Sequence, residues 1–309
     1  MAVMIDRAGA QTLIPEEEVI ELLSGTRKQS VAMQLMRRLP NMSTKTGKIP
    51  VLSLLPQADF VDGDAGMKVT TSAAWEKKQI VVGEIAAIVP IPQAVIDDAE
   101  YDIWGEVRPL LEESFGRVFD HQVFSGGNPK APMEWPDGLI PQAIAAGNNI
   151  TLGGGQDILD DINSLFAVLE DAEYDVTGLA AQRSMRAQLR NVRDANGGFL
   201  FASPTSGSDD NPFGVPVHYV GRGTWDRSQA IAIAGDWNNA VWSMRQDMTV
   251  QIFDTGVISD DAGRVVYNFL QQDMIALRAV MRMGWQVANP IDIDRDATAF
   301  PFSVLQAGN

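Results

Sequence analysis

Residues 102–124 read DIWGEVRPLLEESFGRVFDHQVF, and this stretch decides the fold. Its apolar side chains recur three and four positions apart with charged ones mostly between them, which is the pattern of an amphipathic helix. Asp102 is a candidate N-cap, and the glycine-rich residues 125–129 end the helix. The expected apolar positions are Ile103, Val107, Leu110, Leu111, Phe115, Val118, Phe119 and Phe124. The expected polar positions are Glu106, Glu112, Glu113, Arg117 and Asp120.

The composition of the 309 residues excludes several kinds of site. The chain has no cysteine, which removes disulfides, thiolate metal sites and cysteine nucleophiles. It has only two histidines, His121 and His218, which argues against a multi-histidine metal site and against a Ser-His-Asp triad. No apolar run reaches the ~18 residues that suggest a membrane span, and the N-terminus lacks a signal-peptide pattern. We therefore expect a protein kept in a cytoplasm or in something assembled there, with no membrane contact, metal or cofactor.

The net charge of −16 argues against general nucleic-acid binding, which needs clustered lysine and arginine. The charge is unevenly placed: residues 22–58 contain no acidic residue, whereas residues 97–120 contain eight against two arginines. Two interpretations remain open, namely two solvated faces, or a basic arm of one subunit lying against an acidic helix of another. The basic residues of the arm are Arg27, Lys28, Arg37, Arg38, Lys45 and Lys48.

The first third of the chain contains segments that cannot make a core by themselves. Residues 15–23 could form a short helix, and residues 26–39 are further amphipathic material ended by Pro40. Extended runs at residues 49–55 and 67–71, with a further run that begins near Ala74, flank a Gly/Asp turn at residues 62–66 and predict a hairpin. An isolated two-stranded ribbon is marginal in water, so we expect this hairpin to lie on the body or on a neighbouring subunit.

Three apolar runs predict strands. Residues 80–91 are almost unbroken apolar and β-branched, which indicates a buried strand beneath the long helix. Apolar residues at every second position from Ile275 to Val287 favour a strand over the alternative of a helix. Residues 248–253 predict a further strand before it, followed by a polar connection over residues 254–264.

The middle of the chain alternates between helical and extended patterns. Residues 156–172 and 182–192 predict helices, residues 176–180, 215–220 and 230–234 predict short strands, and residues 194–211 predict a loop. Because strands from both ends of the chain belong with the long helix, we expect a discontinuous first domain with this α/β unit inserted. The fold class is therefore α+β.

No motif in the chain predicts catalysis. Gly153-Gly154-Gly155 precedes a helix but lacks the Lys-Ser/Thr that completes a phosphate-binding loop. The paired aspartates, such as Asp160-Asp161, lack calcium-loop spacing and are interpreted as solvated or helix-capping carboxylates. Four tryptophans without interleaved basic residues are interpreted as core or interface anchors, namely Trp225, Trp237, Trp242 and Trp285. We do not expect an enzyme, although an α/β protein with a small ligand between its domains remains the alternative.

Several segments together resemble the major capsid protein of tailed bacteriophages, with the fold named after phage Hong Kong 97. They are KKQIVVGEIAAIVPIPQAVIDDAEYDIW (77–104), GVPV (214–217), AGDW (234–237) and RAVMRMGWQVANP (278–290). The resemblance implies an N-terminal arm at 1–45, an E-loop hairpin at 46–79 and a P-domain at 80–140 with its spine helix. It also implies an inserted A-domain at 141–247 and a return to the P-domain at 248–309.

The resemblance implies a capsid shell of hexamers and pentamers in the virion, assembled in the host bacterial cytoplasm. Its partners would be a portal, a separate scaffolding protein, a possible decoration protein, and packaged DNA bound without sequence specificity. Bacterial encapsulins are similar to this fold, so a compartment shell is an alternative function. The implied E-loop assembly residues are Asp62, Gly63, Asp64, Gly66, Lys68 and Trp75. Those of the spine helix are Asp102, Glu106, Glu112, Glu113 and Arg117.

Some members of this family join neighbouring subunits by an isopeptide bond between an E-loop lysine and a P-domain asparagine. Lys68 and Asn268 stand at comparable places, but the assisting carboxylate is expected at position 275, where this chain has Ile275. On a strand, the nearest acid, Asp273, would lie about 7 Å from that place. A proton acceptor must come within roughly 3 Å of its donor. We therefore predict shells without covalent links.

Overall fold

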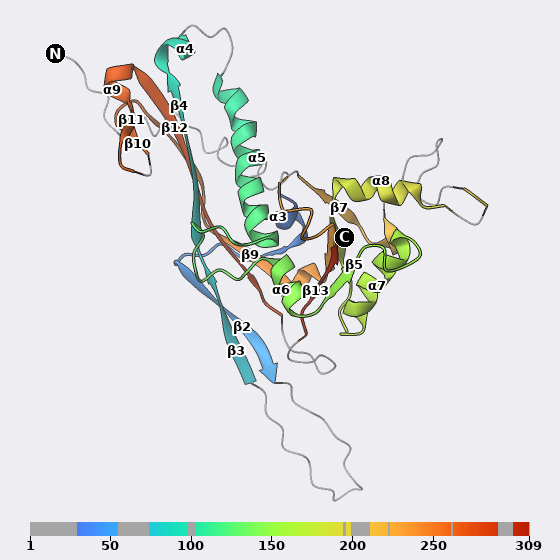
Figure 1. Ribbon diagram of the computed structural model, residues 1–309. Coiled ribbons are helices and arrows are strands. Elements are labelled where there is room, and N and C mark those ends of the chain that lie inside the picture. Colours follow the sequence, from blue (N-terminus) through green and yellow to red (C-terminus); the bar gives the residue numbers. More distant parts are fainter. Residues whose placement is uncertain are drawn as a thin grey trace, which may run out of the picture.

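A computed structural model describes residues 30–54, 74–97, 103–193, 196–198, 211–221, 223–260, 262–289 and 299–308. The chain is a mixed α+β structure with a four-stranded sheet, a five-stranded sheet and two two-stranded ribbons (Figure 1). The helix expected at 15–23, the hairpin turn at 62–66 and most of the loop at 194–211 lie outside the described residues. Within the described residues, no helix is long and apolar enough to cross a membrane.

The four-stranded sheet has the order β1-β9-β12-β4. Its long central strands β9 (Ala240–Phe253) and β12 (Met274–Val287) are antiparallel, and β4 (Gly83–Pro92) is antiparallel to β12. The short β1 (Arg37–Arg38) pairs in parallel with β9. The prediction of a strand at 275–287 is confirmed, and the strand expected at 248–253 is the second half of the longer β9.

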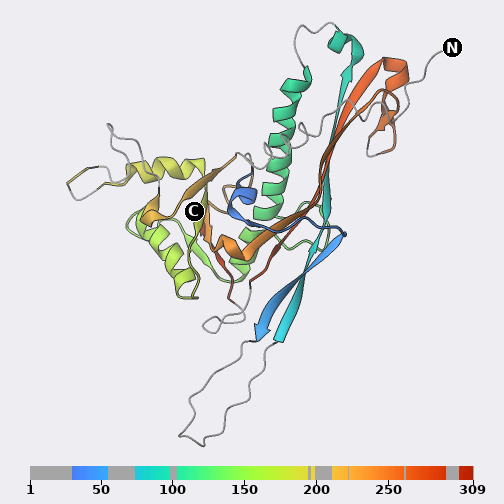
Figure 2. The same ribbon diagram turned by 180° about the vertical axis from the view of Figure 1, so that it is seen from behind.

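The long helix α5 (Ile103–Phe124) runs beside this sheet in both front and rear views (Figures 1 and 2), so the helix prediction is confirmed. Its side chains at four-residue spacing, Leu111, Phe115 and Phe119, are buried in the same cluster as Met281 and Met283 of β12. The expected apolar stripe is too wide: Leu110 is 65% exposed and Val118 is 39% exposed. Both lie one position before the residues that contact the sheet, and the helix turns them outward.

The single buried strand expected at 80–91 is two strands. β3 (Ala74–Val81) pairs with β2 (Thr46–Leu54) as the predicted hairpin, and β4 begins after Val82, whose N–H donates to the carbonyl of Lys45. β4 is an edge strand with alternating burial, and Ile88 is 50% exposed. Pro90 and Pro92 are tolerated there because an edge strand has a side with no neighbour to receive hydrogen bonds.

The five-stranded sheet has the order β5-β13-β8-β6-β7. Four of its strands come from the middle of the chain, namely β5 (Asn149–Thr151), β6 (Gly178–Gln182), β7 (Val217–Val220) and β8 (Ala232–Gly235). The fifth, β13 (Phe302–Gln306), comes from the C-terminal end and was not predicted; it lies between β5 and β8.

Helices α7 (Ile158–Glu170) and α8 (Arg183–Asn191) pack against this sheet and correspond to the two predicted helices. The other side of the sheet shares the main core with α5, α6 (Leu139–Ala145) and the one-turn helix η2 (Trp237–Asn239). Another one-turn helix, η1 (Pro212–Gly214), precedes β7. The expectation that the four tryptophans are core anchors is confirmed, since Trp225, Trp237, Trp242 and Trp285 are at most 5% exposed.

Three shorter segments differ from our expectations. Within the described part of the amphipathic segment expected at 26–39, residues 30–39, the helix α3 (Val31–Leu35) ends early, because Met36 is extended and the chain then joins the sheet as β1. The connection expected at 254–264 contains β10 (Val257–Ser259), which pairs with β11 (Val265–Asn268) as a second ribbon. A short helix α9 (Phe269–Gln272) joins this ribbon to β12, and a further one, α4 (Gln93–Asp97), follows β4.

Candidate assembly surfaces

The arm is anchored to the long helix at Asp120, which the sequence pattern placed on the polar face but which is only 3% exposed. Its carboxylate accepts hydrogen bonds from Ser30 Oγ at 2.6 Å and from the backbone N–H groups of Val31 and Ala32, both at 3.0 Å. The Ser30 hydroxyl in turn accepts from Met33 N–H at 3.1 Å. Serine and aspartate together therefore cap the N-terminus of α3 and tie it to α5.

Burial raises the pKa of Asp120 to about 6, although its three hydrogen bonds act in the opposite direction. The carboxyl lines a polar cavity of about 350 Å³ between α5, α8 and β7. Arg117, Arg183 and His218 line the same cavity, and burial lowers the pKa of His218. The cavity lies at the seam between the two sheets, so these residues connect the two halves of the body.

The described basic residues of the arm region are exposed, namely Arg37, Arg38, Lys45 and Lys48. Arg38 lies over the ring of Trp242, 5.5 Å from its centroid, and donates to Asn41 Oδ1 at 3.1 Å. Arg27 and Lys28 lie outside the described residues. Among the described residues, no ion pair joins this basic set to the acidic residues of α5.

The acidic face of α5 is partly neutralised by its own helix. Glu113 forms an ion pair with Arg117 at 2.6 Å, one helical turn away. Glu112 is half-buried, Asp102 lies outside the described residues, and the side chain of Glu106 is not described. A contact between the basic arm of one subunit and this helix of another stays a prediction.

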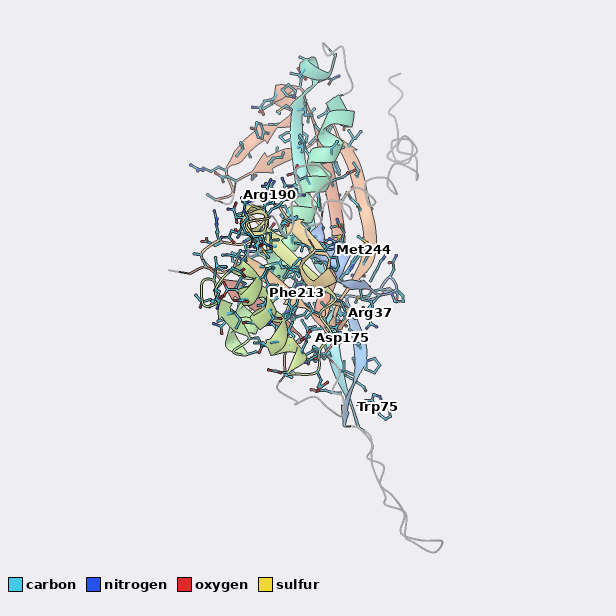
Figure 3. The ribbon with its side chains drawn as sticks, turned by 90° about the vertical axis from the view of Figure 1, so that its right-hand side faces the viewer. Arg37, Trp75, Asp175, Arg190, Phe213 and Met244 are labelled. Carbon is cyan, nitrogen blue, oxygen red and sulfur yellow. The ribbon has the colours of Figure 1, made fainter. Side chains whose placement is uncertain are left out.

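Within the described residues, the hairpin β2–β3 is bonded to the body at its base. Lys78 Nζ donates to the carbonyl of Val287 at 3.2 Å, Gln286 Nε2 to that of Gln79 at 3.0 Å, and Trp135 Nε1 to that of Val81 at 2.7 Å. Farther out, Trp75 is 65% exposed and projects from the hairpin away from the body (Figure 3). The expected turn residues Asp62, Gly63, Asp64, Gly66 and Lys68 lie outside the described residues.

The second ribbon presents large apolar side chains to solvent on both of its faces. We call β10, β11 and α9 together the distal apolar surface, which lies at the end of the four-stranded sheet away from the hairpin (Figure 1). Contiguous exposed apolar groups of this kind mark contact sites in soluble proteins. The exposed fractions are 57% for Val257, 58% for Val265, 48% for Val266, 37% for Tyr267 and 75% for Leu270.

Of the residues considered for a covalent link, Asn268 and Asp273 are described, whereas Lys68 lies outside the described residues. Asn268 ends β11 and donates from Nδ2 to Gln271 Oε1 at 3.0 Å. We had expected Asp273 to lie on a strand, and this prediction is wrong. Asp273 follows α9 in the left-handed conformation, with φ of 46°, and its side chain is exposed. An exposed carboxylate on a turn differs from the buried proton acceptor that such a reaction uses.

The glycine loop before α7 is folded around a carboxylate of its own chain. Asp161 is 2% exposed and accepts from Gly153 N–H at 2.7 Å and Gly155 N–H at 2.8 Å, while Asp157 caps the helix. Asp161 is therefore buried rather than solvated, and the loop amides already have an anionic partner. Within the described residues there is no cluster of three or more His, Cys, Asp or Glu that could hold a metal ion.

Three comparisons with known proteins agree with this geometry. The model of the phage capsid family matches residues 10–293. The major capsid protein of Staphylococcus phage 80alpha is 26% identical over 87% of this chain and 79% of its own length. A solved structure from Microbacterium phage Oxtober96 is 36% identical with a TM-score of 0.80, covering 99% of this chain and 100% of the other. One from Mycobacterium phage Adephagia is 28% identical with a TM-score of 0.77, and 99% of each chain is covered.

Proposed function

The chain belongs to the phage capsid family and is a phage major capsid protein, and on that premise we propose how its surfaces build the shell. It assembles with copies of itself into a closed icosahedral shell of hexamers and pentamers around the phage DNA. The observation that carries this proposal is that elements with little core of their own project from a well-packed body. They are the hairpin β2–β3 and the distal apolar surface.

We assign the parts of the chain by the pattern of the Hong Kong 97 fold. The four-stranded sheet with α5 serves as the P-domain and its spine helix, the β2–β3 hairpin as the E-loop, and residues 1–45 as the arm. The five-stranded sheet serves as the inserted A-domain. Two details modify the boundaries expected from the sequence: β9 continues across residue 247, and β13 belongs with the inserted domain rather than with the P-domain.

The charged and projecting residues then have roles between subunits. The arm residues Arg37, Arg38, Lys45 and Lys48, with Arg27 and Lys28 before them, would lie against acidic residues of a neighbouring spine helix such as Glu112. Trp75 and the E-loop turn would lie across a neighbour. The remaining partners we propose are a portal, a separate scaffolding protein, a decoration protein outside, and DNA held without sequence readout, with assembly in the host cytoplasm.

Purified protein tests this proposal directly. Size-exclusion chromatography and negative-stain electron microscopy should show closed shells of uniform size, whereas a monomer under all assembly conditions would contradict it. A variant in which residues 59–71 are replaced by a short turn should remain a folded subunit and form no shells, because the body keeps its core. Shells of normal size from that variant would show that the hairpin is not an assembly element.

A further inference from the structure

The outer edge of β4 carries backbone groups without a partner among the described residues. In the four-stranded sheet, β4 is an edge strand beside β12. Gln93, directly after β4, donates its N–H to the carbonyl of Asp273 at 2.8 Å and continues the register of that pair. In an antiparallel pair every second residue bonds to the partner strand, so the odd-numbered residues of β4 bond to β12. Glu84, Ala86 and Ile88 therefore direct their N–H and C=O groups away from the sheet.

The unpaired part of this edge is bounded on both sides. Before it, Val82 N–H donates to the carbonyl of Lys45 at 2.9 Å, so the chain that leads into β2 covers the edge there. After it, Pro90 and Pro92 occupy further outward-directed positions and have no N–H to donate. We call residues 84–88 the open edge. Its length matches that of a short β-strand.

The side chains of the open edge leave room for another strand. Soluble proteins usually protect an exposed strand edge with charges, prolines, bulges or a covering segment. Here the prolines protect only the end of β4, and the charge of Glu84 is paired with Arg282 at 2.7 Å. Ala86 is small and exposed, and Ile88 is 50% exposed. The open edge is therefore a template for the addition of a strand.

The hairpin of the same subunit cannot reach the open edge. Figures 1 and 2 show β3 and β4 nearly in line, with the β2–β3 hairpin running away from β4. At about 3.3 Å per residue, the path from Ala74 to Glu84 covers roughly 33 Å. Residues 67–71 lie within about 25 Å of Ala74 even when the chain is fully extended. A strand that this segment adds to the open edge must therefore belong to a second copy.

The sequence of the hairpin favours one of its limbs as the added strand. Residues 67–71, which lie outside the described residues, read MKVTT. Val69, Thr70 and Thr71 are β-branched, and the segment contains neither proline nor glycine, as is typical of a strand. The opposite limb contains Pro56, which has no N–H to give to a sheet.

We propose that residues 67–71 of a second copy add to β4 as a further strand along the open edge. This inference rests on the proposed function and names one contact within it. The backbone groups of the open edge would bond to those of the added strand, and the exposed side chain of Ile88 would gain an apolar neighbour on the same face. A two-stranded ribbon is marginal in water, so the hairpin also gains stability by joining a larger sheet.

The open edge of a second copy could instead pair with this one. Such a contact is isologous and joins two subunits around a two-fold axis. A ring of five or six subunits needs two different surfaces on each subunit, because each contacts the next head to tail. The open edge and the hairpin are two different surfaces of this kind, which favours pairing of β4 with the hairpin of the next subunit.

Proline substitution in the full-length protein tests whether the open edge is used. Ala86→Pro removes one outward N–H and keeps the bonds to β12, as Pro90 and Pro92 do at equivalent positions. Loss of one hydrogen bond at every subunit contact should lower the yield of shells about tenfold or more. Ala86→Thr, which keeps the N–H and favours a strand, is the matched control and should assemble normally. Circular dichroism of each unassembled subunit verifies the fold.

Disulfide formation identifies the partner segment, because the chain has no cysteine of its own. Ala86→Cys is combined with a single cysteine substitution at each of residues 67–71 in turn, and the oxidised shells are run on a non-reducing gel. Side chains alternate between the two faces of a strand, so the yield of linked subunits should rise and fall with a period of two along the segment. Ala86→Cys alone should give no linked subunits.

Four results are decisive against one assignment or another. Normal shell yield from Ala86→Pro would show that the open edge is not used. Shells without a link at any position from 67 to 71, or with equal links at all of them, would show that this segment does not pair as a strand. Linked subunits from Ala86→Cys alone would assign the open edge to β4 of a second copy. Failure of the wild-type protein to form shells would count against the proposed function itself.

Discussion

The five-stranded sheet and the distal apolar surface differ in what they bury. Every residue of β8 is buried, as are the first four of β6 and of β13, so the centre of that sheet is covered on both faces. In β11, three of four residues are exposed although two are valine and one is tyrosine. The same classes of side chain thus stabilise the subunit in one region and remain available for another molecule in the other.

The hairpin β2–β3 lies between these extremes and shows where the body ends. Its base fits closely against β12, because a Cβ on Gly284 would lie 2.4 Å from the carbonyl oxygen of Val81. Trp75, farther out on the same strand, is mostly exposed. The change from close packing to exposure within one strand marks the boundary between the folded subunit and the part that needs a neighbour.

The largest effect on stability is expected from Phe302→Ala in β13. Phe302 is fully buried, packs edge to face on Trp237 with ring centroids 5.0 Å apart, and fills the space beside Gly235. Its truncation should lower the unfolding free energy of the unassembled subunit by about 3–5 kcal/mol. Urea unfolding followed by tryptophan fluorescence measures this loss. Phe213→Ala is the control, since Phe213 is 59% exposed, and an equal loss there would remove the distinction between core and surface.

The seam between the two halves should respond to pH through Asp120. Because the pKa of its carboxyl is raised to about 6, the folded subunit binds this proton more tightly than the unfolded chain. The stability from this proton is therefore fully present below pH ~4 and is lost as pH rises through about 6. We expect the unfolding free energy of the wild type minus that of Asp120→Asn to fall by about 2 kcal/mol between pH 4 and pH 6, and by a further fraction above pH 6.

Urea unfolding across a pH series measures this difference. Comparison of the two proteins cancels the titration of groups that both retain, including Glu113, Arg117, Arg183 and His218 around the same cavity. If the unfolding free energy of the wild type minus that of Asp120→Asn does not change from pH 4 to pH 7, Asp120 remains ionised beneath α3 throughout. Its three hydrogen-bond donors would then stabilise the carboxylate.

The distal apolar surface should show the opposite pattern from Phe302. Leu270→Ser is expected to change the stability of the unassembled subunit by no more than about 0.5 kcal/mol, because Leu270 is 75% exposed. It should nevertheless reduce the yield of shells, since the side chain is buried only when another subunit covers it. Met133→Ser, at a side chain that is 99% exposed and outside this surface, is the control for assembly. Equal yields from the two variants would contradict the assignment.

Local patterns predicted the elements well where the signal lies within one segment. The period of two from Ile275 to Val287 and the helical spacing around Phe115 each describe a single element, and both predictions are confirmed. The sequence did contain a sign that residues 80–91 form two strands, namely Gly83. In the structure a Cβ at this position would lie 2.7 Å from the Trp135 ring. Continuous β-branched residues on both sides obscured it.

The features that were missed depend on distant residues. Asp120 follows Glu113 and Arg117 in the helical pattern and looks like a surface position; its burial requires Ser30, which is 90 residues away. Ser30 carried a local signal, since serine before an apolar run is a helix N-cap. β13 has only five residues and gains its place from β5 and β8, so no periodicity within it could reveal the sheet. The cleft lined by Lys45, Gly83, Arg245 and Arg282 likewise combines four separate segments.

The smallest expected effect is that of Lys68→Ala, which should not change whether neighbouring subunits are covalently linked. Asn268 ends the distal ribbon with its amide bonded to Gln271, and the nearest acid, Asp273, is exposed on a left-handed turn. An exposed carboxylate keeps its solvating water and cannot approach a buried amine as a proton acceptor. We therefore expect boiled, purified shells to give a single 33.6 kDa band on a denaturing gel, both for the wild type and for Lys68→Ala. A ladder of multiples in the wild type that is absent from Lys68→Ala would mean that a carboxylate of another subunit completes the site, and that the distal ribbon is joined covalently rather than by its apolar side chains.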